Sequence, residues 1–358
     1  MEPVSNGHRA LGTRKMKAAV LYGKEDVRLE EVSLPEPGPG EVVIRVRSAL
    51  TCGTDLKVFR NGSHAKMLKP PALFGHEYAG IVERVGAGVT RWKPGARVVG
   101  ANSAPCRSCF FCQRNQPNLC KDLLFVNGAY AEYLKIPARI VKENLLEIPE
   151  ELSFQRAALT EPLACVVRGM QVARPTRGET VAVLGTGPVG LMFIQLLAGA
   201  GIQVIAVGKG TRRLKAAGAF GAQTVLDLAG LPDPTARVRA ETPEGLGPDL
   251  VIEAVGRPAA WSQAISVVRP GGRVLLFGGC PPATEVPLDT RRMHYDELTL
   301  LSAFHHTPEA IRESLDLLAR GVVRSDLLVT GQAPLADLPA ILHRMLTEQD
   351  TVKTEIQP

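Results

Sequence analysis

One stretch constrains the fold of this chain more than any other: ETVAVLGTGPVGLMFIQLLAGAG, residues 179–201. It has the pattern of a buried strand, a glycine-rich turn and a helix. Glycines spaced as G-x-G-x-x-G permit a tight turn and let backbone amides approach a pyrophosphate at the helix N-terminus. We therefore predict a dinucleotide-binding turn, with an ordinary strand–helix turn as the alternative. The residues expected to contact the cofactor are Gly185, Gly187, Pro188, Val189 and Gly190.

After this turn, apolar segments alternate with helical stretches, as in QVIAVG, TVLDL, DLVIEAVG, GRVLLFGG and LTLLSAF. The alternation predicts an α/β domain with a doubly wound parallel sheet. Residues 181–207 carry no charge and are long enough to be mistaken for a membrane span. The glycines and the proline inside this segment argue against a membrane helix, so no membrane partner is expected.

The first half of the chain has a different pattern, in which short apolar runs such as EVVIRVRSAL and EYAGIVERVG are separated by turns rich in glycine and proline. This pattern predicts an irregular β-rich domain. Two segments after residue 306 have helical spacing and are expected to pack back on that domain. We therefore predict a flexible tail over 1–15, a catalytic domain from 16–162 and 307–358, and a dinucleotide-binding domain over 163–306.

Charge limits the classes of partner. The chain has 42 Lys and Arg residues against 36 Asp and Glu residues, a net charge of +6, without a dense basic cluster. Nucleic acid is therefore not an expected partner, and a small-molecule substrate is. The first 15 residues lack an apolar signal core, so a cytoplasmic location is expected.

Seven cysteines, an odd number, argue against a disulfide framework in a chain of this kind. Four of them have the spacing C-x2-C-x2-C-x7-C, which suits one tetrahedral ion better than paired bridges. Four thiolates around zinc leave no open position for substrate, so this zinc is expected to be structural. An iron–sulfur cluster or a transient redox group is the alternative. The four expected ligands are Cys106, Cys109, Cys112 and Cys120.

Metal chemistry would need a second site. The β-rich half contains CGTD, with Cys52, and GHE, with His76 and Glu77, while TEPLAC places Glu161 at the predicted domain junction. Three protein ligands and one exchangeable ligand make a catalytic zinc site. The alternatives are a buried apolar cysteine, a core histidine and a helix-capping glutamate.

The second strand of the dinucleotide-binding half ends in VIAVGKGTRRL. Gly208 stands where such units normally carry the acid that binds the adenosine ribose. Glycine leaves room for a 2′-phosphate, and the following cations Lys209, Arg212 and Arg213 would attract it. This favours NADP(H) over NAD(H), with a solvated basic helix start as the alternative. Val255, at the end of DLVIEAVG, is a further expected cofactor contact.

From Met16 onward the chain resembles the medium-chain zinc-dependent alcohol dehydrogenases. The residues that carry the resemblance are CGTD, GHEYAGIVERVGAGV, the four-cysteine segment, EPL and GTGPVG. The glutamate in EPL is similar to that of the threonine and polyol (sorbitol-type) branch. The resemblance implies a GroES-like catalytic domain joined to a Rossmann domain, two zinc ions per chain, and a homodimer or homotetramer.

The same resemblance implies roles for individual residues. Cys52, His76 and either Glu77 or Glu161 would bind the catalytic zinc. Thr54 would hydrogen-bond the substrate oxygen, and Asp55 would lie behind the zinc-bound histidine.

Three more positions follow from the resemblance. Lys57 stands where many members have the histidine that ends a proton relay, so either this relay ends differently or protons leave through the cofactor ribose and water. His305 and His306 match positions that contact substrate in the polyol branch, although a histidine pair at a strand end is also common as plain polar surface.

These observations predict a zinc-dependent oxidoreductase that transfers hydride between a secondary alcohol, polyol or amino alcohol, or the matching carbonyl, and NADP(H). An NAD-dependent polyol or threonine-type dehydrogenase is the first alternative. A zinc-free quinone or enone reductase would lack both sets of zinc ligands, and a non-enzymatic zinc module would leave GTGPVG unexplained.

Overall fold

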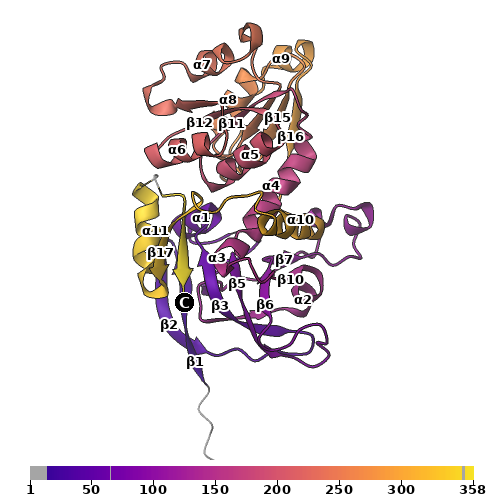
Figure 1. The fold of residues 1–358 in the computed structure, drawn as a ribbon, viewed down its shortest axis with the longest axis vertical. Coiled ribbons are helices and arrows are strands. Elements are labelled where there is room, and N and C mark those ends of the chain that lie inside the picture. The colour runs from indigo at the N-terminus through magenta and orange to yellow at the C-terminus, as the bar shows by residue number, and fades with distance from the viewer. Residues whose placement is uncertain (1–13, 65, 349–350) are drawn as a thin grey trace, which may run out of the picture.

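A computed structural model of the chain describes residues 14–64, 66–348 and 351–358. A β-rich part and a part built on a parallel sheet lie at opposite ends of the molecule, as Figure 1 shows. The first strand, β1 (Lys15–Gly23), starts close to where the sequence predicts it. Most of the tail predicted over 1–15 falls on residues 1–13, which lie outside the described residues.

The β-rich part contains a three-stranded sheet in the order β2-β1-β4 and a larger sheet in the order β10-β6-β5-β3-β18-β17, with β9 also paired to β3. In β3 the sequence VVIRVRSAL alternates, so that Arg45 and Arg47 face solvent while Val46 is buried. The bounds are β2 (Asp26–Ser33), β3 (Val42–Leu50), β4 (Ala72–Leu73), β5 (Tyr78–Val85), β6 (Arg97–Gly100), β9 (Tyr133–Ile136), β10 (Leu145–Glu147), β17 (Val329–Pro334) and β18 (Lys353–Gln357).

The second part has a six-stranded parallel sheet in the order β13-β12-β11-β14-β15-β16, which confirms the predicted doubly wound topology. The order reverses between β11 and β14, and ligands of such sheets bind beyond the carboxyl ends of the strands at this point. The bounds are β11 (Thr180–Leu184), β12 (Gln203–Gly208), β13 (Thr224–Asp227), β14 (Leu250–Glu253), β15 (Arg273–Leu276) and β16 (Thr299–Ser302).

Both faces of this sheet are covered by helices. Val181 and Val183 of β11 face a core shared with α4 and α5, whereas Ala182 and Leu184 face a core shared with α7 and α8. Burial on both faces explains why the strands have continuous apolar sequences rather than alternating ones. The helix bounds are α4 (Thr160–Ala173), α5 (Pro188–Gly199), α6 (Thr211–Ala219), α7 (Pro234–Ala240), α8 (Pro258–Val267) and α9 (Thr290–Tyr295).

The uncharged segment 181–207 folds as β11, α5 and β12, and none of these is a membrane helix. Among the residues that the structure describes, no helix is both long enough and apolar enough to span a bilayer.

The chain returns to its first part after β16. Helix α10 (Pro308–Ala319) packs along α4, where Ser314 Oγ donates a 2.8 Å hydrogen bond to the Thr160 carbonyl. Strand β18 then pairs antiparallel with β3, and α11 (Leu338–Thr347) packs on α1 (Gly53–Asn61). The C-terminal residues therefore share a sheet with the β-rich half (Figure 1). The remaining strands and α-helices of the described residues are β7 (Ser103–Ala104), β8 (Leu124–Phe125), α2 (Ala138–Asn144) and α3 (Phe154–Ala157).

Candidate active site

Three expected metal ligands meet where two neighbouring strands end. Cys52 is the N-cap of α1, just after β3, and His76 and Glu77 come directly before β5. Because β3 and β5 pair antiparallel with Ala49 opposite Tyr78, the end of one strand lies beside the start of the other. The ligand atoms of Cys52, His76 and Glu77 lie within 4.8 Å of one another. Sulfur, nitrogen and oxygen at this spacing fit zinc, which binds these atoms at about 2.0–2.3 Å.

The orientation of His76 is set by two further side chains. Its Nδ1 lies 2.8 Å from Asp55 Oδ1, and Tyr130 donates a 2.6 Å hydrogen bond to Asp55 Oδ2. All three side chains are buried. Since Nδ1 is engaged by Asp55, the ring presents Nε2 to the ligand cluster, as a metal-binding histidine requires.

Tyr130 was not among the predicted site residues. Its ring packs against Gly75, the glycine that precedes His76. Gly75 has a φ of +88°, and a Cβ atom there would come within 2.5 Å of the Tyr130 ring. Glycine at the start of GHE is therefore required both by the left-handed backbone and by the close approach of this ring. Tyr130 lies 75 residues from Asp55, so no local pattern could have identified it.

Glu77 is held by a residue that the sequence analysis also missed. Lys353 Nζ lies 2.8 and 2.6 Å from the two carboxylate oxygens of Glu77 and donates a third hydrogen bond, 2.8 Å long, to the Thr51 carbonyl. Both side chains are almost fully buried. Burial raises the pKa of Glu77, and the ammonium group of Lys353 acts in the opposite direction.

Glu161, the other candidate third ligand, lies in the first turn of α4. It groups with His305 and His306, with ligand atoms within 4.8 Å of one another, and its Oε1 is 3.9 Å from His306 Nε2. Burial raises the pKa of Glu161 to about 7. The geometry thus places Glu77 with Cys52 and His76, and Glu161 with the histidine pair.

His305 and His306 follow β16 and are held against the β-rich part. His305 Nε2 lies 2.6 Å from Ser103 Oγ, and His306 Nε2 lies 3.1 Å from Asn102 Oδ1. Burial, followed by the charge of His76, lowers the pKa of His305 to about 3, so this imidazole is neutral at neutral pH. His306 is 2% exposed, so the pair is not plain polar surface.

The four-cysteine segment also folds as a compact group. The sulfurs of Cys106, Cys109, Cys112 and Cys120 lie within 4.8 Å of one another, and none of them forms a disulfide. The Cys109 sulfur is 3.6 Å from that of Cys112 and 3.9 Å from that of Cys120. Four sulfurs bound tetrahedrally at about 2.3 Å from zinc would be ~3.8 Å apart, so the group fits a closed zinc site.

The predicted dinucleotide turn joins β11 to α5, with Gly187 as the N-cap and Pro188 in the first turn. A Cβ at Gly190 would lie 1.8 Å from the Gly185 carbonyl oxygen, and a Cβ at Gly185 would lie 2.9 Å from Val255 Cγ2. A Cβ at Gly187 would meet nothing within 4 Å, so this glycine faces open space. The turn therefore leaves backbone amides accessible at the N-terminus of α5, as pyrophosphate binding requires. Val189 follows in the same helix.

Strand β12 ends at Gly208, where the space for a larger side chain is occupied by Thr186. A Cβ at Gly208 would come within 2.1 Å of Thr186 Oγ1, so the Thr186 side chain occupies the space that an acid would need. Lys209 next to it is exposed, and Arg212 is exposed in the first turn of α6. Arg213 donates a 2.7 Å hydrogen bond to the Thr351 carbonyl, so at least one of its nitrogens serves to hold the C-terminal segment.

Lys57, the residue at the relay position, connects the two parts of the molecule. It lies on α1, and its Nζ donates a 3.0 Å hydrogen bond to the Gly279 carbonyl in the segment that follows β15. The helix that begins at Cys52 therefore faces the carboxyl edge of the parallel sheet.

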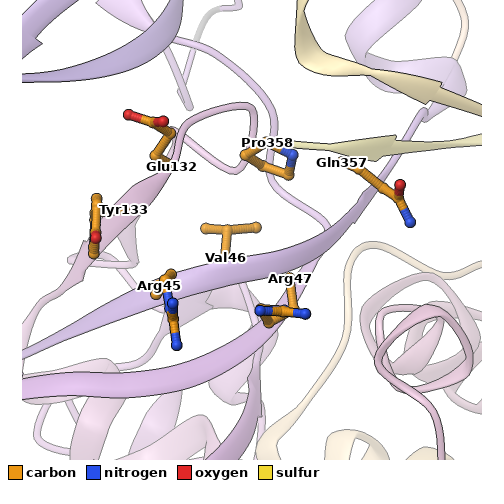
Figure 2. A pocket seen from close by; sticks show the side chains of 7 residues that line it. All are labelled: Arg45, Val46, Arg47, Glu132, Tyr133, Gln357 and Pro358. Carbon is orange, nitrogen blue, oxygen red and sulfur yellow. The ribbon is translucent and has the colours of Figure 1, made fainter.

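A separate cavity of about 360 Å³, shown in Figure 2, is lined by β3, β9 and the C-terminal residues Gln357 and Pro358 and includes none of the metal ligands named above.

Two family models match this chain. Residues 38–150 match the family model described as alcohol dehydrogenase GroES-like domain, and residues 188–320 match the model described as zinc-binding dehydrogenase. Sorbitol dehydrogenase of Bacillus subtilis is 30% identical over 96% of this chain and 98% of its own length. L-threonine 3-dehydrogenase of Bacillus licheniformis is 33% identical over 90% of this chain and 93% of its own.

Solved structures are similar over nearly the whole chain. A zinc-binding dehydrogenase of Sinorhizobium meliloti bound to NADP has a TM-score of 0.87 and 29% identity, covering 96% of this chain and 100% of that one. Alcohol dehydrogenase TADH from Thermus sp. ATN1 has a TM-score of 0.84 and 33% identity, covering 96% of this chain and 99% of that one.

The geometry of the cysteine group leads to a prediction for Cys109→Ser. We expect this variant to lose one zinc per chain by elemental analysis and to unfold at a lower temperature, because a metal that binds only the folded state stabilises it. Cys280→Ser, outside both ligand groups, is the matched control and should keep its full zinc content. An unchanged zinc content in Cys109→Ser would show that this segment is not a zinc site.

Proposed function

Because the chain belongs to the medium-chain zinc-dependent alcohol dehydrogenase family, we propose that it transfers hydride between a secondary alcohol, polyol or amino alcohol, or the matching carbonyl, and NADP(H). The chain is a zinc-dependent, NAD(P)-dependent oxidoreductase, and the alternative of a non-enzymatic zinc module is wrong. One observation carries the proposal: Lys57 joins the helix that begins at the ligand Cys52 to the carboxyl edge of the dinucleotide sheet. An alcohol bound beside Cys52 and His76 would therefore lie near the edge of the sheet where the cofactor is expected.

Each group of residues has a distinct task in this proposal. Cys52, His76 and Glu77 would hold the catalytic zinc, while Asp55 and Tyr130 fix the His76 ring. The metal and the nicotinamide supply, when bound, polarisation of the substrate oxygen and acceptance of a hydride.

The hydroxyl proton needs an acceptor from the chain. Thr54, two residues after Cys52 and in the first turn of α1, would accept the proton of the substrate hydroxyl while its own hydroxyl proton passes on through the cofactor ribose to water. His305 and His306 would contact the rest of the substrate, since both lie next to Glu161, which is close enough to His76 to feel its charge.

Two zinc ions per chain follow from the two ligand groups. The one held by the four cysteines would be structural, and the other catalytic. For the third catalytic ligand we favour Glu77, because its carboxylate lies with Cys52 and His76, whereas Glu161 lies with the histidines. Lys353 would then keep Glu77 ionised, which is the form that binds metal.

The preference for NADP(H) is supported by the end of β12. No acid stands at Gly208 to repel a 2′-phosphate, and the cations Lys209 and Arg212 lie just beyond it. Thr186 takes up the space at Gly208 itself, so the support comes from the charges and not from the room that the sequence suggested there. The Sinorhizobium meliloti relative was solved with NADP, while rspB from Escherichia coli CFT073, 26% identical, was solved with NADH. An NAD-dependent polyol or threonine-type dehydrogenase is therefore the second candidate.

Assembly and location are further parts of the proposal. We propose a homodimer or homotetramer, as the family resemblance implies. We also propose a cytoplasmic location, because all seven cysteines are free and four of them form a thiolate metal site, which a reducing compartment preserves.

The role of Thr54 leads to a prediction for a pair of variants. Thr54→Ser keeps the hydroxyl and should retain kcat/KM for an alcohol substrate within about threefold, whereas Thr54→Val should lower it by ~10²-fold or more. Sorbitol, threonine and butane-2,3-diol, each tested with both cofactors, are suitable first substrates. Equal activity of the two variants would remove Thr54 from proton transfer.

The cofactor proposal leads to a prediction for Lys209→Ala. We expect this change to raise the Kd of NADP⁺ about five- to tenfold and to leave that of NAD⁺ unchanged, because only NADP⁺ has the 2′-phosphate. Lys215→Ala, also exposed and on the helix α6 that follows Lys209, is the matched control. Fluorescence titration measures both constants. Tighter binding of NAD⁺ by the wild-type protein would contradict the proposed preference.

A further inference from the structure

A cavity of about 500 Å³ lies between the four-cysteine segment and the residues that follow β16. We call it the lysine–phenylalanine pocket, after the residues that give it its chemistry. These are Lys66, Phe111, Leu119, Lys121, Phe125 and Phe304. Its wall also includes Cys120, so the structural zinc site forms part of its frame.

The pocket adjoins the candidate active site through His305. The rings of Phe125 and Phe304 have centroids 5.5 and 5.6 Å from that of His305. The His305 ring in turn lies 3.9 Å from the ring of His306, which is next to Glu161. His305 is a proposed substrate contact, and its ring packs against Phe125 and Phe304 of the lining, so a substrate that contacts His305 would reach the edge of the pocket.

A hydrogen bond between Asn118 and Phe304 holds the two sides of the pocket together. Asn118, which also lines the pocket, donates a 3.0 Å hydrogen bond from Nδ2 to the Phe304 carbonyl. This bond joins the four-cysteine segment to the residues after β16, so the two walls keep a defined separation.

The lining combines aromatic surface with positive charge. Lys66 Nζ lies 5.3 Å from the centre of the Phe304 ring, and Lys121 lines the same cavity. No carboxylate is among the described residues that line it. The neighbouring Asp122 is bound by Arg139 at 2.7 Å, so its charge is already balanced. Three phenylalanines and two ammonium groups suit an apolar chain with a negative end better than a chain of hydroxyl groups.

We propose that this pocket binds the distal part of the substrate, an apolar chain that ends in an anionic group. The preferred substrate is then an amphipathic secondary alcohol with a negative terminus rather than a free sugar alcohol. This inference rests on the proposed dehydrogenase function and narrows its substrate class.

The first test compares 9-hydroxydecanoate with decan-2-ol, which has the same reacting group and chain length but no charge. We expect kcat/KM to be at least about tenfold higher for the hydroxy acid. Lys66→Met and Lys121→Met should each reduce this ratio by about three- to fivefold, and raised salt should also reduce it. Lys93→Met, an exposed lysine outside the pocket, should leave the ratio unchanged. Equal kcat/KM for the two alcohols would overturn the inference while leaving the dehydrogenase function intact.

A second test needs no turnover. Calorimetric titration of the zinc-loaded protein with octanoate should show binding that the double variant Lys66→Met/Lys121→Met weakens about tenfold, and Lys93→Met should bind as the wild type does. Stronger binding of octyl phosphate than of octanoate would identify phosphate as the terminal group. If octanoate binds equally to all variants or not at all, the inference is wrong. If octanoate binds as expected but no alcohol is oxidised, the proposed function fails instead.

Discussion

The buried carboxylate of Asp55 is the group on which the candidate active site depends. One of its oxygens lies 2.8 Å from His76 Nδ1 and the other accepts a 2.6 Å hydrogen bond from Tyr130. A carboxylate that is only 2% exposed must be fully hydrogen-bonded, since loss of one partner of a buried charge costs about 3–5 kcal/mol. Helix α1 and the loops before β5 and β9 are therefore locked together before any metal binds.

The Glu77–Lys353 ion pair extends this constraint to the end of the chain. Lys353 is the first residue of β18, and this strand pairs with β3, which ends just before Cys52. The ammonium group of Lys353 therefore lies beside Glu77 in the candidate metal site. The pair is buried, and Lys353 donates its third hydrogen bond to the carbonyl of Thr51, the residue before Cys52. The candidate metal site formed by Cys52, His76 and Glu77 thus depends on residues from distant parts of the chain, and the returning C-terminal segment contributes Lys353 to it.

The sequence allowed prediction of those features that have a local pattern. The doubly wound parallel sheet followed from alternating apolar and helical segments, and the four-cysteine group followed from its spacing, whereas CGTD, GHE and EPL left the third catalytic ligand open between Glu77 and Glu161. Tyr130 and Lys353 were missed because each acts on a partner at least 75 residues away. The sequence also could not show that Thr186 fills the space beside Gly208, since a side chain that crosses between two strand ends leaves no periodic signal.

The most direct test of this account is the metal content and activity of His76→Ala. The variant should be less stable, because Asp55 loses one of its two partners. The separate cysteine group should still hold one zinc per chain, and the folded protein should bind cofactor as the wild type does and lose turnover. The wild-type protein should contain two zinc ions per chain. Two zinc ions and near-wild-type turnover in His76→Ala would contradict the assignment of His76 as a ligand of the catalytic metal.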